Sequence, residues 1–136
     1  MYRTEGDKTI SVLLVDDQPA ARQGLRIRLT VEPDVTVVGE AGSGEEAIRL
    51  ARTLSPDVVL MDVEMPGMDG ITATVALRVA APHVAVVILS LYDDARTKMR
   101  AREAGAVAFV AKHEAKTALL ATIRRVVGST ERADTP

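Results

Sequence analysis

The sequence alternates five times between a short apolar run and a longer amphipathic stretch, and this alternation narrows the possible folds more than any other feature. The runs are rich in valine, leucine and isoleucine, which is typical of strands buried on both faces of a sheet. We predict strands at Ile10–Val15, Val35–Ala41, Val58–Met61, Val84–Leu89 and Val107–Val110. The repeated strand–helix order predicts an α/β fold, with a parallel five-stranded sheet and helices on both of its faces.

The amphipathic stretches between and after these runs predict five helices. The first begins near Gln18, with Pro19 in its first turn, where a missing backbone N–H costs nothing. The other four are predicted at Gly44–Leu54, Asp69–Ala80, Asp93–Ala104 and Glu114–Val127. Proline or glycine follows each of these four within two residues, as is typical of helix ends.

The chain has 136 residues, which is enough for one domain with its own core. We predict a flexible N-terminus over residues 1–8, one domain over residues 9–128, and a polar tail or the start of a linker over residues 129–136. Hydrophobic residues make up 47% of the chain and the net charge is −2. These values fit a globular domain that has no global basic field for holding nucleic acid.

Several absences from the sequence bear on where the chain works. It contains no cysteine, which excludes disulfides and thiolate metal sites. No apolar stretch approaches the roughly 18 residues that a membrane span needs. Residues 1–8 are polar and lack the apolar core of a signal peptide. We therefore expect a cytoplasmic protein without a membrane partner.

Acidic residues follow two of the predicted strands. Asp16 and Asp17 end the first apolar run, and Asp62 ends the third. If these strands are parallel neighbours, the three carboxylates converge at one edge of the sheet, and their mutual repulsion costs free energy unless a cation offsets it. Three carboxylate oxygens completed by water suit Mg²⁺. The sequence therefore predicts a magnesium site.

Two further polar residues follow the fourth and fifth runs. Ser90 is placed to donate a hydrogen bond to a phosphoryl oxygen, and Lys112 to pair with another such oxygen as a point charge. Asp62 is then either a nucleophile that forms a mixed anhydride or only a ligand. Each of these residues alone is ordinary at a strand end. The argument rests on five suitable residue types at the ends of four strands.

Two blocks of sequence resemble a known family across about Thr9 to Val127. They are Val-Leu-Leu-Val-Asp-Asp and Leu-Met-Asp-Val-Glu-Met-Pro-Gly-Met-Asp-Gly, and they are similar to the receiver domain of a bacterial two-component response regulator. The resemblance implies a flavodoxin-like (βα)5 receiver of strand order 2-1-3-4-5. It also implies a phosphorylation-activated signalling domain that uses Mg²⁺ (or Mn²⁺) and changes conformation to control an output.

The resemblance assigns a role to each candidate residue. Asp62 matches the phosphoacceptor, and Ser90 and Lys112 match the residues that contact the phosphoryl group. Ser90 and Phe109 match the pair that switches conformation. The implied metal ligands are Asp16, Asp17, Asp62 and the backbone carbonyl of Glu64.

Shorter blocks, Val-Val-Gly-Glu-Ala, Ser-Leu-Tyr-Asp-Asp and Ala-Gly-Ala, resemble the receivers that usually precede a LuxR-type helix-turn-helix. The resemblance implies a sensor histidine kinase as phosphodonor and transcription regulation through a DNA-binding domain that is not in this chain. It implies no enzyme activity beyond the chain's own phosphorylation and dephosphorylation. We expect a homodimer on phosphorylation through the first and last helices, whose outer faces carry Ile27, Leu120 and Val127.

Three departures from the family pattern stand out. His113 follows Lys112 where many receivers have a cis proline, which leaves the geometry of that bond open. Glu64 places an acidic side chain over the expected phosphoryl site. The fourth helix has weak inward candidates (Ala95, Met99 and Ala104) and four basic residues: Arg96, Lys98, Arg100 and Arg102. This helix is either a solvated face, a loosely anchored switch helix or a docking surface for an acidic partner.

Two other functions fit the same fold. A phosphatase with an aspartyl nucleophile typically needs a second aspartate two residues later, where this chain has Glu64. A flavin-binding module needs an aromatic residue near the site to stack on the flavin, and only Tyr92 is available. The fold alone does not decide between these functions, and the signalling receiver accounts for most of the candidate residues.

Overall fold

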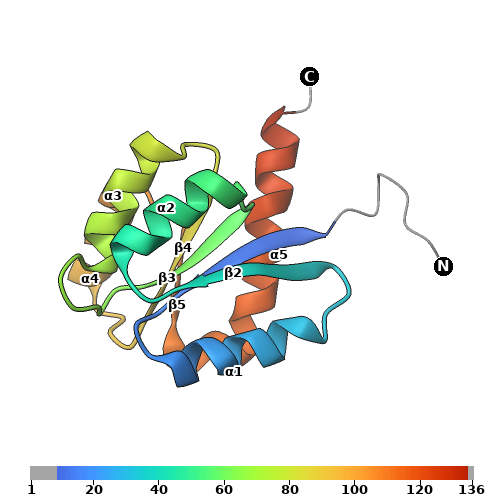
Figure 1. Cartoon of the computed structure of the whole chain (residues 1–136), viewed down its shortest axis with the longest axis horizontal. Helices are drawn as coiled ribbons and strands as arrows, with labels where there is room; N and C mark the ends of the chain where they lie inside the picture. The colour runs from blue at the N-terminus through green and yellow to red at the C-terminus, as the bar shows by residue number, and fades with distance from the viewer. Residues whose placement is uncertain (1–8, 135–136) are drawn as a thin grey trace.

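The computed structural model describes residues 9–134. These residues form a five-stranded parallel sheet between two layers of helices (Figure 1). The strands are β1 (Ile10–Val15), β2 (Val35–Ala41), β3 (Val58–Asp62), β4 (Ala85–Ser90) and β5 (Ala108–Ala111). The helices are α1 (Pro19–Thr30), α2 (Gly44–Leu54), α3 (Gly70–Ala80), α4 (Ala95–Ala104), the short 3₁₀ helix η2 (Lys112–Glu114) and α5 (Ala115–Asp134). The strand order is β2-β1-β3-β4-β5, which confirms the predicted flavodoxin-like fold.

The helices cover the two faces of the sheet unequally. Figure 1 shows α1 and α5 on one face and α2, α3 and α4 on the other. Alternate side chains of each strand enter one of two apolar cores, because successive residues of a strand point to opposite faces. Leu14 and Leu60 lie in the core beneath α1 and α5, whereas Leu13 and Met61 lie in the core beneath α2 and α3.

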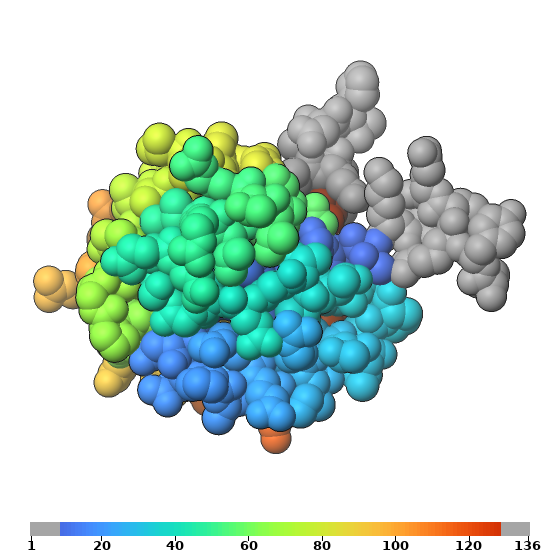
Figure 2. Space-filling view, viewed as in Figure 1, coloured from blue at the N-terminus to red at the C-terminus, as the bar shows by residue number. Residues whose placement is uncertain are grey.

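The edge strand β2 contains an irregularity. Val12 of β1 pairs with Val37, but the next residue, Leu13, pairs with Gly39, so that Val38 is an extra residue in the ladder. Such a bulge changes the side to which the following side chains point. In the space-filling view (Figure 2), the cyan surface of the β2 region lies between the surfaces of α1 and α2 on the visible face of the molecule.

The predicted bounds of β1, β2 and α2 match the structure. The other three strands each end one residue later than predicted, and β4 and β5 also begin one residue later. The structure ends β3 at Asp62, β4 at Ser90 and β5 at Ala111. The polar end residues stay in the ladder because each has a partner on the next strand: Asp62 pairs with Leu89, and Ser90 with Ala111.

Two helices differ more. The structure begins α4 at Ala95 because the Asp94 side chain accepts a hydrogen bond from the backbone N–H of Thr97 and caps the helix. Helix α5 does not stop at Val127 but continues to Asp134. A glycine within a helix costs only about 1 kcal/mol, so that Gly128 does not end it.

The buried face of α4 also corrects the prediction. Ala101 and Ala104 are buried, whereas Ala95 is exposed and Met99 is 61% exposed. Both fully buried residues of this helix are alanines, which leaves it with little apolar contact. The C-terminal end of α4 is held instead by Arg78 of α3, whose Nη1 donates to the carbonyl of Glu103 at 3.2 Å.

Candidate functional site

The candidate residues gather at the carboxyl edge of the sheet, at the switch point between β1 and β3. Open α/β sheets bind ligands at this point. Asp16 follows β1, and Asp62 and Ser90 end their strands; all three are buried. Asp17 and Lys112 are half-buried at the same edge. The structure thus brings Asp16, Asp17, Asp62 and Lys112 together and places Ser90 at the same edge of the sheet.

The three carboxylates form a cluster that can hold a metal ion. One carboxylate oxygen from each of Asp16, Asp17 and Asp62 lies within 4.8 Å of the others. Lys112 crosses this cluster, because its Nζ lies 3.2 Å from Oδ2 of Asp16 and 3.2 Å from Oδ1 of Asp62. The lysine therefore offsets part of the negative charge that the strand ends concentrate here.

The charges of Asp62 and Lys112 depend on each other. Burial raises the pKa of Asp62 from 3.8 to about 6, helped by the charge of Asp16 and opposed by Lys112. Burial alone would lower the pKa of Lys112, but attraction to Asp62 and Asp16 is stronger, and the pKa lies above its ordinary value. At pH 7 the lysine is charged and the Asp62 carboxylate is predominantly ionised.

The donor set suits a hard divalent cation. Oδ1 of Asp62 is buried and accepts no well-aligned hydrogen bond among residues 9–134, since its contact with Lys112 is an ion pair. An incompletely satisfied carboxylate oxygen beside two further carboxylates fits a Mg²⁺ ligand set of oxygen atoms and water. The cluster therefore has the chemistry of a magnesium site.

The loop between β3 and α3 packs tightly against the site, and this close packing requires glycine at two positions. The backbone N–H of Gly70 donates to the carbonyl of Val63 at 2.9 Å. A Cβ atom on Gly70 would lie 2.0 Å from the carbonyl oxygen of Asp62, so no side chain fits there. Gly67 has a φ of +76°, which other residues seldom adopt. The glycines let the loop double back beside Asp62.

Ser90 and Phe109 lie near the site but do not touch each other in any contact that the structure describes. Oγ of Ser90 accepts a hydrogen bond from the backbone N–H of Tyr92 at 3.0 Å, which ties the serine to the β4–α4 loop. The ring of Phe109 is half-buried, and Nζ of Lys98 on α4 lies 5.8 Å from its centroid. This distance is within the range of a cation–π interaction.

The structure shows the surroundings of Glu64 and His113, two residues that depart from the family pattern. The side chain of Glu64 is exposed, and its backbone N–H helps to lower the pKa of Asp62. The bond between Lys112 and His113 is trans, since residues 9–134 contain no cis peptide bond. Nε2 of His113 lies 3.8 Å from a carboxylate oxygen of Asp93, so the loops on either side of the site approach each other.

The sequence did not predict the support behind Asp16. Nη1 of Arg22, on α1, contacts the backbone carbonyl oxygen of Asp16, and Nε of Arg22 lies 3.0 Å from Glu40 of β2. Arg26 contacts the second oxygen of Glu40. Only the sequence block around Glu40 drew attention to this region, and it gave no indication of the pairing.

The strand order and the acidic cluster define a flavodoxin-like α/β domain with its polar site at the topological switch point. The chain belongs to the family of the response regulator receiver domain, which it matches over residues 12–124. Receiver domains are signalling modules of two-component systems. Within residues 9–134, no helix has the length and apolar character that crossing a bilayer requires.

Known proteins support this assignment. The chain is 41% identical over 115 residues to the transcriptional regulatory protein YxjL of Bacillus subtilis, covering 85% of this chain and 53% of that protein. It is 36% identical over 104 residues to the response regulator protein VraR of Staphylococcus aureus, covering 76% and 50%. The chain therefore spans about half the length of these curated relatives.

Solved structures agree with the sequence relatives. A two-component response regulator of the LuxR family from Aurantimonas sp. SI85-9A1 superposes with a TM-score of 0.86 at 34% identity, covering 90% of this chain and 87% of that chain. The response regulator domain of CheB from Thermotoga maritima superposes with a TM-score of 0.83 at 32% identity, covering 89% and 98%. The fold is thus shared with solved response regulator domains.

Proposed function

We propose that this receiver domain accepts a phosphoryl group on Asp62 from a sensor histidine kinase. One observation carries the proposal: Asp62 is buried in the acidic cluster with Oδ1 incompletely satisfied and Lys112 bridging it to Asp16. This carboxylate is predominantly ionised at pH 7, so it can act as a nucleophile. Asp16 and Asp17 flank it as ligands for the cation.

The proposed step exchanges one bond to phosphorus for another. An oxygen of Asp62 forms a bond to the phosphorus atom, and the bond from phosphorus to the kinase's phosphohistidine nitrogen breaks. The bonding electrons return to the imidazole nitrogen, and the product is an acyl phosphate on Asp62. Lys112 is 3.2 Å from this carboxylate and can pair with a phosphoryl oxygen in the product.

Four groups would hold the cation: the carboxylates of Asp16, Asp17 and Asp62 and the backbone carbonyl of Glu64. When bound, Mg²⁺ supplies positive charge that neutralises phosphoryl oxygens. The chain's own residues orient the carboxylate and exclude water from it, because Asp62 is only 4% exposed. We propose that this domain catalyses its own phosphorylation and dephosphorylation and turns over no other substrate.

We infer that the signal leaves through Ser90 and Phe109. The hydrogen bond from Tyr92 to Ser90 would be exchanged for one to the phosphoryl group, and the ring of Phe109 would turn inward. The output is transcription regulation in the cytoplasm, through a DNA-binding domain outside this chain, as the names and lengths of the relatives suggest. We further propose that phosphorylation favours a homodimer through α1 and α5.

The test is phosphorylation by a small phosphodonor with Mg²⁺, followed by intact-mass analysis. We expect one added phosphoryl group in the unaltered chain and none in Asp62→Asn. Asp17→Ala should keep the fold and lose the Mg²⁺-dependent reaction. Undiminished labelling of Asp62→Asn would refute the assigned phosphoacceptor.

A further inference from the structure

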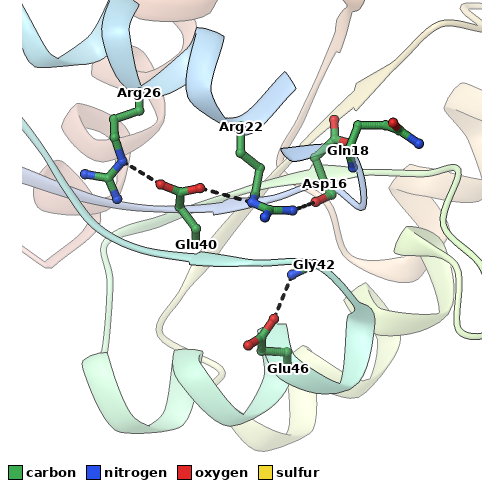
Figure 3. A network of polar contacts seen from close by, with 7 residues as sticks. All are labelled: Asp16, Gln18, Arg22, Arg26, Glu40, Gly42 and Glu46. Atoms are coloured by element: carbon green, nitrogen blue, oxygen red, sulfur yellow. Dashed lines mark hydrogen bonds and ion pairs between the residues drawn. The ribbon is translucent and has the colours of Figure 1, made fainter. Parts of the chain in front are cut away.

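Asp16 is held by all four of its polar backbone and side-chain groups. Its backbone N–H donates to the carbonyl of Ala41 at 3.1 Å. Its side-chain Oδ1 accepts from the N–H of Gln18 at 2.9 Å, and Oδ2 accepts from Nζ of Lys112 at 3.2 Å. The backbone carbonyl oxygen accepts from Nη1 of Arg22 (Figure 3). Of these four partners, only Arg22 lies within α1.

The carbonyl contact constrains Asp17 as well as Asp16. The carbonyl of Asp16 and the N–H of Asp17 belong to one planar peptide group. Fixing the direction of the carbonyl therefore fixes the plane from which the Asp17 side chain departs. The hydrogen bond from Arg22 thus constrains the peptide group that joins two residues of the acidic cluster.

Arg22 is itself held in place by the edge strand. Its Nε lies 3.0 Å from Oε1 of Glu40, while Oε2 of Glu40 contacts Nε of Arg26 (Figure 3). The Arg22 side chain is only 19% exposed, so this pair is shielded better than a surface ion pair. The hydrogen bond from Arg26, opposed by burial and assisted by Arg22, holds the pKa of Glu40 below its ordinary value.

We propose that Arg22 is a positioning residue of the cation site: held by Glu40, it orients the Asp16–Asp17 peptide so that both carboxylates face the ion. The inference rests on the proposed magnesium site. Outer partners that orient metal ligands commonly change metal affinity without touching the metal. A guanidinium suits the task because its fork reaches the carboxylate and the carbonyl at once.

A simple charge effect would change the Mg²⁺ affinity of an Arg22 variant in the opposite direction. Arg22 carries a positive charge near a cation site, and removing a positive charge strengthens the attraction for Mg²⁺. If only charge mattered, Arg22→Met would bind Mg²⁺ more tightly. If positioning matters, the same variant binds Mg²⁺ more weakly. The chain also offers a matched control in Arg26, which pairs with the same glutamate but has no described contact with Asp16.

The experiment is a Mg²⁺ titration of the unphosphorylated chain, followed by the chemical shifts of backbone amides near the site. We expect Arg22→Met to raise the dissociation constant about tenfold, and Arg26→Met to leave it unchanged or slightly lower. Thermal unfolding in EDTA provides a second readout. A purely structural role would lower the melting temperature of both arginine variants without separating their Mg²⁺ affinities.

Asp17→Ala separates the two proposals. If Asp17→Ala loses Mg²⁺ binding and Arg22→Met does not weaken it, the positioning role is overturned and the magnesium site stands. If Asp17→Ala binds Mg²⁺ normally, the acidic cluster is not the cation site and both proposals fail. Should Arg22→Met not fold, Arg22→Lys takes its place with the same expectation, because lysine keeps the charge but loses the fork.

Discussion

At the scale of single residues, the carboxylate of Asp62 is charged in surroundings that disfavour its charge. Burial raises its pKa from 3.8 to about 6. Between these two pH values the folded chain binds more protons than the unfolded chain, so the free energy of unfolding falls as the pH rises through this window. Above pH 6 the full penalty is present, and two pKa units correspond to about 3 kcal/mol. The fold therefore gives up stability in order to keep this carboxylate buried.

Asp62→Asn should remove that penalty. In EDTA at neutral pH, we expect the variant to have a free energy of unfolding about 1–3 kcal/mol higher than that of the unaltered chain. The gain should shrink as the pH falls towards 4, because Asp62 is then protonated in the unaltered chain. Urea denaturation at a series of pH values measures both. A difference that does not change with pH would mean that charge burial is not its cause.

We predict opposite changes in the free energy of unfolding when Gly70 and Gly24 are each replaced by alanine. Gly70→Ala places a methyl group 2.0 Å from the carbonyl oxygen of Asp62 and should lower the free energy of unfolding by about 2–3 kcal/mol. Gly24 lies within α1 with no atom within 4 Å of a built Cβ, so Gly24→Ala should raise it by about 1 kcal/mol. Thermal or urea unfolding of the two variants measures the difference. Equal effects would contradict the tight fit of the loop.

At the scale of elements, α4 has weak apolar anchoring, because both of its buried residues are alanines. It is held through Ala101 and Ala104, the capping side chain of Asp94 and the contact from Arg78 at its C-terminal end. Exposed segments with few buried apolar contacts open locally at low free-energy cost. We therefore propose that α4 is a switch element. The hydrogen bond from the N–H of Tyr92 to Ser90 ties the loop before this helix to the site.

We predict that phosphorylation changes amide hydrogen exchange in α4 and that Ser90 transmits the change. If Ser90 turns towards the phosphoryl group, the N–H of Tyr92 loses its acceptor and the loop before α4 must move. Ser90→Ala should still accept phosphate but show a smaller change in α4 exchange, and Asp62→Asn should show none. An unaltered response in Ser90→Ala would exclude the serine as the relay.

The same scale shows what the sequence can predict. Apolar runs identify the strands because each buried strand needs apolar residues on both faces, and polar residues at their ends identify the site edge. The buried face of α4 could not be predicted in this way, because the helix has no apolar stripe. The spacing of apolar residues favoured Met99 as an inward residue, whereas the smaller Ala101 packs against the sheet. The pairing of Arg22 with Glu40 depends on strand register and on the side to which each residue points. Local patterns do not fix either property.

At the scale of the whole molecule, the face formed by α1 and α5 is a candidate contact between two copies. Ile27 is 60% exposed there, but Leu120 and Val127, expected to point outward, are half-buried and pack against the core. The apolar surface offered for a dimer is therefore smaller than the sequence suggests. A two-fold interface also has to be self-complementary.

Ile27→Glu tests this face with little risk to folding, because the side chain is exposed. We expect phosphodonor to shift the unaltered chain towards dimer in sedimentation and to leave Ile27→Glu monomeric, since two buried carboxylates would face each other across the axis. Val79→Glu on α3, at an 84% exposed position, is the matched control and should dimerise normally. Normal dimerisation of Ile27→Glu would move the interface to another face.

The bulge in β2 has a consequence for how this chain tolerates changes in length. Glu40 pairs with Leu14, whose side chain enters the core beneath α1, only because Val38 is one residue too many for a regular ladder. Deleting Val38 would remove the bulge and leave Gly39 opposite Leu13 and Glu40 opposite Leu14, so that Glu40 would still face both arginines. The edge strand can therefore lose one residue at this point without inverting which side chains face which helix, and the support behind the acidic cluster would survive the deletion.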